Sequence, residues 1–254
     1  MKNALLLVAL AFGGWMQAQT NASMTNSLRD DINNGNLEPS PYRIIYGVSQ
    51  EAGKVQGDVY LDAEWQKADV WFYPEVVAQY DPKASDKVSS LPIRIDLGNQ
   101  YVEFKLPEGV KAIEAGSIKK IELHGEAPGG VRTFVNTKQY GQTDKNLGGF
   151  AEVLSEGKIT VVKYTKLWLK QPTYNVALNV GERDAKLIKQ KDYYLVHEKN
   201  GVFRLDKFKP GMGSLKKITK SKAKKVEAFI NEKSLDPKND ADLAKILAYY
   251  NELS

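Results

Sequence analysis

The stretch IRIDLGNQYVEFKL, from Ile93 to Leu106, decides the fold class because it contains every part of a β-hairpin. Apolar and polar residues alternate on both sides of the pair Gly98-Asn99, which is typical of a two-residue turn. The apolar positions are Ile93, Ile95, Leu97, Val102, Phe104 and Leu106. A period of two places them on one face of each strand, so we expect an antiparallel hairpin with one buried face.

The same pattern recurs along much of the chain. FAEVL at 150–154 and ITVVKYTKLWL at 159–169 flank the turn residues 155–158, which predicts a second hairpin. A third is predicted from Tyr193–His197 and Val202–Leu205, joined by Asn200-Gly201. Other β-type runs are Tyr42–Val48, Val59–Leu61, Val70–Tyr73, Ile118–Leu123 and Val131–Val135. The main body is therefore predicted to be a largely antiparallel sheet, or a sandwich- or barrel-like variant of one.

Two short helices are predicted at the C-terminal end, which makes the fold class α+β and mostly β. In the first, Val226, Phe229 and Ile230 form an apolar stripe. In the second, residues 243, 246, 247 and 250 form another, and Asn239 and the acids after it suit a helix start. Pro237 lies in the break between the two helices.

The N-terminal residues predict export. Lys2 precedes an apolar run over 4–15 and small or polar residues near Ala18, which is the layout of a secretory signal peptide. The run is shorter than the roughly 20 residues of a membrane-spanning helix, so we expect no transmembrane span. We predict a signal peptide at 1–19, a mobile leader at 20–41, a β-rich domain at 42–170, and a hairpin plus helical pair at 171–254. The mature chain is expected to be soluble and either periplasmic or extracellular.

The absence of cysteine excludes a disulfide framework and every thiolate-dependent site. Charge is unevenly distributed: residues 20–150 carry a net charge of −4, whereas residues 151–254 carry +8. Lysines are dense in SLKKITKSKAKKVEAFI, residues 214–230, where the candidate anion contacts are Lys217, Lys220, Lys224 and Lys225. On a continuous helix the lysines at 220, 222, 224 and 225 are spread over the sides that the apolar stripe does not occupy, so they form no basic ridge, and the stretch contains no Arg. This pattern favours a solvated helix face and argues against a nucleic-acid partner.

No motif predicts a catalytic, cofactor or metal site. His124 and His197 are isolated, and residues 211–213 lack the ending of a phosphate loop. Asp236, Asp240 and Asp242 resemble a calcium loop only in part, since Ala241 replaces the glycine and Leu247 the bidentate glutamate. The acidic pairs are Asp30/Asp31, Asp62/Glu64 and Glu182/Asp184, and none has an identifiable catalytic partner.

Four aromatic residues lie close together in the sequence: Trp65, Trp71, Phe72 and Tyr73. Exported proteins that bind sugars or peptides often use such aromatic side chains as a binding platform. Strand alternation sends Trp71 and Tyr73 to one face and Phe72 to the other. At least one of these faces is expected to be core.

The order FAEVLSEGKITVVKYTKLWLK, NVGERD, KDYYL, KKVEAFI and DLAKILAYYN resembles a family of uncharacterised exported bacterial proteins. Those proteins share a β-rich body, a late hairpin and a closing helical pair that ends in Tyr-Tyr-Asn. The resemblance extends from about Lys54 to Asn251 and implies export and fold, with no activity and no functional residues.

The sequence as a whole favours an exported binding or structural accessory protein of the cell envelope, with an envelope protein or glycan as partner. Two alternatives stay open. One is an envelope enzyme of the hydrolase type, whose acidic and tyrosine residues meet only in the folded chain. The other is weak binding of a polyanion by the basic C-terminal half.

Overall fold

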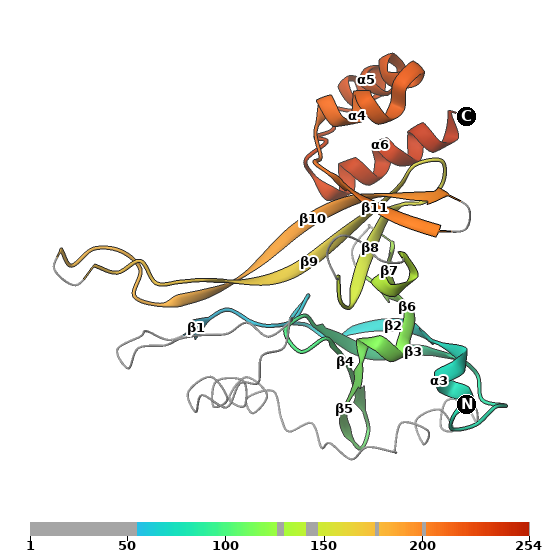
Figure 1. Cartoon of the computed structure of the whole chain (residues 1–254), viewed down its shortest axis with the longest axis vertical. Helices are drawn as coiled ribbons and strands as arrows, with labels where there is room; N and C mark the ends of the chain where they lie inside the picture. The colour runs from blue at the N-terminus through green and yellow to red at the C-terminus, as the bar shows by residue number, and fades with distance from the viewer. Residues whose placement is uncertain (1–54, 126–129, 141–146, 176–177, 200–201, 254) are drawn as a thin grey trace. The chain divides into compact units, whose positions relative to one another are not determined.

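The computed structural model describes residues 55–125, 130–140, 147–175, 178–199 and 202–253 (Figure 1). The predicted signal peptide, the leader, the run Tyr42–Val48, the pair Asp30/Asp31 and the turn Asn200-Gly201 lie outside these residues. The fold is mostly β, with an open and largely antiparallel sheet and C-terminal helices, which confirms the predicted fold class. The described residues form two compact units, one from the ranges 55–118 and 165–190, the other from 119–164 and 191–253.

In the first unit, four antiparallel strands follow one another as a meander: β2 (Gln66–Phe72), β3 (Lys87–Asp96), β4 (Tyr101–Leu106) and β5 (Gly109–Glu114). The short helix α3 (Pro74–Ala78) connects β2 to β3. The predicted hairpin is confirmed, with Ile93 opposite Phe104 and Ile95 opposite Val102. Its turn is fixed by Asp96, whose carboxylate accepts hydrogen bonds from the backbone N–H groups of Gly98 and Asn99 at 2.8 and 2.9 Å.

This hairpin is buried on more than the apolar face that its alternation predicts. Ile93, Ile95, Val102 and Phe104 are in the core, but Arg94, Asp96 and Glu103 on the opposite face are buried as well. The segment Val59–Leu61 contributes to the cover, because Val59 and Leu61 hydrogen-bond with Leu97 and Ile95 through the backbone. Both faces of the hairpin are therefore buried, one with apolar side chains and the other with charged side chains.

A long two-stranded ribbon also belongs to the first unit. It is formed by the end of β9 (Thr160–Lys170) and the beginning of β10 (Ala185–Lys199), which are neighbours in the sheet. The short β1 (Val55–Gln56) pairs with β10 in parallel. We call residues 165–190 the ribbon, and its outer end is closed by backbone hydrogen bonds from Thr173 to Glu182 and from Asn175 to Val180. β9 and β10 are the labelled yellow and orange strands in Figure 1.

The second unit is also built on a meander. Its strands follow one another in the sheet, each antiparallel to the next, in the order β6 (Ile118–His124), β7 (Val131–Asn136), β8 (Phe150–Ser155) and β9. The short helix η3 (Thr137–Tyr140) follows β7. β10 forms a hairpin with β11 (Val202–Phe208) in the register Tyr193 opposite Phe208. The second and third predicted hairpins are thereby confirmed, although β10 begins well before the predicted Tyr193.

Three helices cover one face of this second sheet: α4 (Met212–Thr219), α5 (Ala223–Glu232) and α6 (Asp240–Glu252). Their apolar residues share a core with residues of β8, β9, β10 and β11. The fully buried members on α6 are Leu243, Ile246 and Leu247, as the predicted stripe requires. Asn239 is the N-cap of α6, and its side chain accepts hydrogen bonds from the N–H groups of Ala241 and Asp242, as expected from its position.

The lysine-rich segment is not one helix. Lys220 has φ +46°, and the turn η4 (Lys220–Lys222) separates α4 from α5. α4 is an addition to the two predicted helices, and Gly211-Met212-Gly213 is its start: Gly211 is the N-cap, with φ +153°. The alternation of Lys and apolar residues gives no sign of this break, because the strained residue is neither Gly nor Asn.

Candidate functional site

The four candidate anion contacts are all exposed, and the break at Lys220 distributes them over separate elements. Lys217 is on α4, Lys220 is in η4, and Lys224 and Lys225 are on the first turn of α5. Between the two helices, Lys216 pairs with Glu227 at 2.8 Å, so part of the basic charge is balanced locally. The structure brings these lysines into one segment but not onto one helix face.

The three acids of the partial calcium loop point to different partners. The carboxylate of Asp236 accepts a hydrogen bond from the N–H of Lys238, and that of Asp242 accepts one from the N–H of Asp236. Asp240 contacts side chains of the sheet instead. Within the part of the chain that the structure describes, no group of three or more His, Cys, Asp or Glu side chains is placed to hold a metal ion.

The two histidines lie on exposed strand positions and not in a group of metal-ligating side chains among the described residues. His124 is exposed at the end of β6, and His197 on β10 is 3.3 Å from Asp206 on β11. Both are surface residues of strands.

Of the predicted aromatic group, one face is core. Phe72 is buried and stacks on Phe104 with ring centroids 6.4 Å apart. Trp71 is half-buried beneath the ammonium of Lys87, 4.5 Å from the ring centroid. The hydroxyl of Tyr73 is buried and has no hydrogen-bond partner among the described residues. These residues do not form a common platform.

Trp65 instead takes part in a buried ion-pair cluster in the first unit. The Arg94 guanidinium lies between two rings, 4.0 Å from the centroid of Tyr60 and 4.1 Å from that of Trp65. It pairs with Glu103 at 2.5 Å, and Glu103 is 1% exposed. The Tyr60 hydroxyl donates to Glu103 at 3.2 Å. Burial, followed by the negative charge of Glu103, raises the pKa of Tyr60 to about 12.

This cluster is closed and internally paired, so its chemistry is structural. Transferring a charged pair from water to the interior costs free energy unless new hydrogen bonds replace those to water. Here the carboxylate, the guanidinium and the phenol form these hydrogen bonds with one another. The two rings add cation–π contacts on both faces of the guanidinium.

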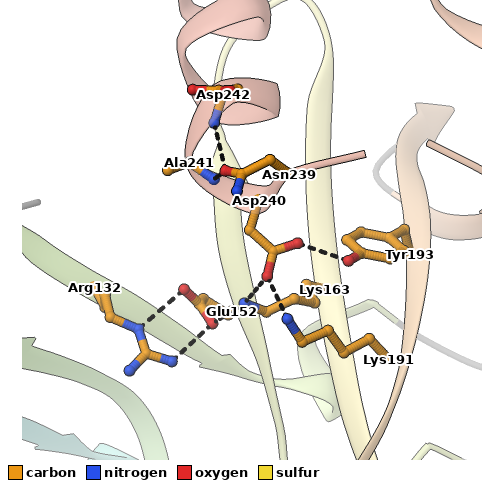
Figure 2. A network of polar contacts seen from close by, with 9 residues as sticks. All are labelled: Arg132, Glu152, Lys163, Lys191, Tyr193, Asn239, Asp240, Ala241 and Asp242. Atoms are coloured by element: carbon orange, nitrogen blue, oxygen red, sulfur yellow. Dashed lines mark hydrogen bonds and ion pairs between the residues drawn. The ribbon is translucent and has the colours of Figure 1, made fainter. Parts of the chain in front are cut away.

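The second unit contains a larger charge network on the face of the sheet where α6 begins (Figure 2). Lys163 on β9 is the centre: its ammonium lies 2.7 Å from Glu152 on β8 and 3.0 Å from Asp240. The side chain of Lys163 is only 7% exposed. Arg132 contacts both carboxylate oxygens of Glu152, at 3.1 and 3.0 Å, and shares one of them with Lys163. The sheet register explains the first contact, since Glu152 and Lys163 are directly opposite in the β8–β9 pair.

Asp240, the first residue of α6, is held by three side chains. Besides Lys163, it accepts hydrogen bonds from Lys191 at 2.8 Å and from the Tyr193 hydroxyl at 2.6 Å, both on β10 (Figure 2). Its place in the first turn of the helix adds a favourable interaction with the helix dipole. The network therefore fastens the start of α6 to two neighbouring strands.

The pKa shifts in this network indicate fixed charges and not acid–base groups. Burial alone would raise the pKa of Asp240, but the hydrogen bonds from Lys191, Tyr193 and Lys163 outweigh it and lower the pKa to about 2. Glu152 behaves similarly: burial opposes ionisation, and Arg132 with Lys163 more than offsets it, so its pKa is lowered. Burial and the bond to Asp240 raise the pKa of Tyr193. At neutral pH both acids are ionised and the phenol is protonated.

The exposed apolar residues point to a different part of the chain. Seven large apolar side chains are exposed among the described residues, and four of them lie on the ribbon, which makes the ribbon the main apolar surface there. Those four are Trp168, Leu178, Val180 and Ile188. Isolated exposed apolar residues are ordinary, but a concentration on one element marks an interaction surface.

The two strands of the ribbon have a buried and an exposed side. Leu169 and Ala185 are buried, whereas Trp168 and Ile188 are exposed. Alternation along each strand places Lys170 and Lys186 on the side of Trp168 and Ile188. Both lysines pair with Glu182, at 3.0 and 2.9 Å. Of the predicted acidic pair Glu182/Asp184, Glu182 thus cross-links the ribbon, whereas Asp184 accepts a hydrogen bond from Gln56 of β1 at 2.6 Å.

Charge is also distributed unevenly between the ribbon and the rest of the first unit. The ribbon contains five basic and two acidic residues, a net charge of +3, whereas residues 55–118 of the same unit contain six basic and eleven acidic residues, a net charge of −5. The ribbon is therefore an apolar and basic element attached to an acidic body, which suits an anionic or amphipathic partner.

Sequence reasoning missed both the buried charge networks and the ribbon. Charged residues within otherwise apolar runs, such as Lys163 in ITVVKY and Glu152 in FAEVL, are the signal for the network. For the ribbon, the signal is the isolated Trp168 between Leu167 and Leu169, which breaks the expected alternation.

Among the helices of the described residues, none has both the length and the apolar character needed to cross a bilayer. No protein-family model, curated protein or solved structure matches this chain.

Proposed function

We propose that the protein is an exported binding or structural accessory protein of the cell envelope and that the ribbon is its binding surface. The observation that carries the proposal is the concentration of exposed apolar side chains on the basic ribbon. The resemblance to exported bacterial proteins with a closing helical pair gives independent support for the location. An envelope protein, a glycan or a lipid are the partners that this location offers.

The alternative of an envelope enzyme receives less support. It needs acidic and tyrosine groups that meet in the fold, and Asp240 and Tyr193 are such a pair. The carboxylate is, however, already bound by two ammonium groups and the phenol, and its lowered pKa makes it a poor base. Glu103 is also fully engaged, because Tyr60 donates to one of its carboxylate oxygens and Arg94 to the other.

The binding role is tested with envelope fractions from the source cells. Mature protein should co-sediment with washed envelopes, and the double variant Trp168→Ser/Ile188→Ser should reduce that association about tenfold, because two apolar contacts are lost. The matched control is Tyr80→Ser, which removes an equally exposed aromatic residue outside the ribbon. Equal loss in the control, or no loss in the double variant, would refute the role of the ribbon.

Export is tested separately. The signal-like order of residues 1–19 implies that protein recovered from the cell envelope begins near Gln19 or Thr20. Intact-mass measurement gives the answer directly, and a mature protein that retains Met1 in the cytosol would contradict export.

The polyanion alternative depends on the lysines of α4, η4 and α5. Because these are spread over separate elements, a heparin or duplex-DNA titration at about 150 mM salt should show nothing tighter than about 10⁻⁶ M. Sub-micromolar binding that vanishes when four lysines are changed together to Gln would favour this alternative; the four are Lys217, Lys220, Lys224 and Lys225.

A further inference from the structure

The structure describes residues 173–175 and 178–182 at the tip of the ribbon, and two of these residues have exposed apolar side chains. Leu178 is 68% exposed and Val180 is 56% exposed. The N–H of Asn175 donates to the carbonyl of Val180 at 2.8 Å, and the Asn175 side chain accepts from the N–H of Leu178 at 3.2 Å. These contacts fix both residues without burying their side chains.

Gly181 shows that this tip geometry is specified by the sequence. Its φ is +101°, and a Cβ at this position would lie 2.4 Å from the carbonyl oxygen of Thr173. No other residue fits there. The described residues on both sides of the tip are therefore held by hydrogen bonds while two apolar side chains stay in solvent, at a cost in free energy that an apolar partner would offset.

Cationic and aromatic groups follow directly behind the tip. The Arg183 guanidinium lies 4.3 Å from the ring centroid of Tyr174 and donates to its hydroxyl at 2.6 Å. Lys170 and Lys186 come next, on either side of Glu182. The order of an apolar end, an aromatic–arginine pair and then lysines matches the depth profile of a membrane interface, where rings and cations lie at the head groups.

We propose that the ribbon tip inserts Leu178 and Val180 into an anionic lipid bilayer surface, with Tyr174, Arg183 and the two lysines at the head-group level. The inference rests on the proposed binding role of the ribbon and names its partner. Charge complementarity supports the choice, because the net charge of +3 on the ribbon is attracted to anionic lipids while the acidic body is repelled. A soluble polyanion would satisfy the cations but leave the two exposed apolar residues without a partner.

The test uses the full mature chain and sedimentation with vesicles of phosphatidylcholine, alone or with about a third phosphatidylglycerol. We expect binding to the anionic vesicles that weakens as NaCl rises from about 0.1 to 0.5 M, and little binding to neutral ones. Leu178→Ser/Val180→Ser should weaken binding at least about tenfold, since each buried methylene contributes to insertion. The control Val131→Ser changes an exposed apolar residue of another strand and should have no effect.

Insertion itself is detected by fluorescence. In a Trp168→Phe background, Leu178→Trp should shift to the blue on anionic vesicles and be quenched by lipids brominated on the acyl chain, whereas Tyr80→Trp should show neither effect. Absence of vesicle binding, or binding without quenching of the tip tryptophan, would overturn the inference. If envelope association still depended on Trp168 and Ile188, the proposed function would stand with a protein or glycan partner. Heparin binding that depends equally on the tip would replace the bilayer by a soluble polyanion.

Discussion

Replacing Lys163 by Met tests whether the charge network of the second unit stabilises the fold. The lysine is almost fully buried between Glu152 and Asp240, so its removal leaves two carboxylates without their shared cation. Breaking a buried pair by removing one partner typically costs about 3–5 kcal/mol. Here Arg132 remains beside Glu152, and Lys191 with Tyr193 remains beside Asp240, which places the cost at the lower end, about 3 kcal/mol.

The assay is urea unfolding followed by far-UV circular dichroism, with thermal unfolding as a second measurement. A loss of about 3 kcal/mol corresponds to a decrease of about 9 °C in Tm for a chain of this size. The surface control Lys225→Met should remain within about 0.5 kcal/mol of the wild type.

A double-mutant cycle separates the pair from its surroundings. Glu152→Gln combined with Lys163→Met removes both charges, so the double variant should be more stable than the sum of the two single losses implies, by at least about 1 kcal/mol. If Lys163→Met alone unfolds at the wild-type urea concentration, the network does not fasten α6 and the argument from burial is wrong.

Three further results are expected. The pKa of the Asp240 carboxyl is lowered from 3.8 to about 2, so its contribution to stability is complete above about pH 4 and is lost as the pH falls from 4 to 2. In Asp240→Asn the urea midpoint should therefore depend less on pH across that range, as measured by urea unfolding. Phe229 is only half-buried and stacks on Tyr249 at 4.0 Å, so Phe229→Ala should lower the unfolding free energy by about 2 kcal/mol, and an unchanged midpoint would mean that α5 and α6 do not pack together. Glu103→Gln leaves Arg94 buried beside a neutral partner and should cost about 3 kcal/mol by urea unfolding, with a cost below about 1 kcal/mol counting against a desolvated pair.

Local patterns were sufficient to predict the hairpins, because each one requires only alternation and a turn within about 15 residues. The cores of α5 and α6 were predictable for the same reason. The length of β9 was predicted to within one residue at each end, but the start of β10 was not, since its first residues are stabilised by neighbouring strands and by the Glu182 cross-links and not by an apolar pattern.

The buried charges could not be predicted from alternation, which assigns every second residue of a strand to solvent. Arg94 is buried because Tyr60 and Trp65, from a segment about 30 residues earlier, cover it. Lys163 is buried because α6 lies over it, and their contact joins residues 77 positions apart. Such long-range cover depends on packing, which the period of a single strand does not encode.

The side chain of Asn251, near the end of α6, joins the last turn of that helix to the turn between β8 and β9. Its carbonyl oxygen accepts from the N–H of Ile159 at 3.0 Å, and its amide donates to Ser155 at 2.9 Å. Gly157 leaves room for it, because a Cβ there would lie 2.8 Å from the amide nitrogen.

These bonds impose an order on biosynthesis. A ribosome makes the β8–β9 turn more than 90 residues before the asparagine that completes it. The β8–β9 turn therefore lacks its hydrogen bonds with the Asn251 side chain until the end of α6 has been synthesised. A chain interrupted just before Asn251 would contain every strand and nearly the whole of the last helix, yet its β8–β9 turn would lack this closure.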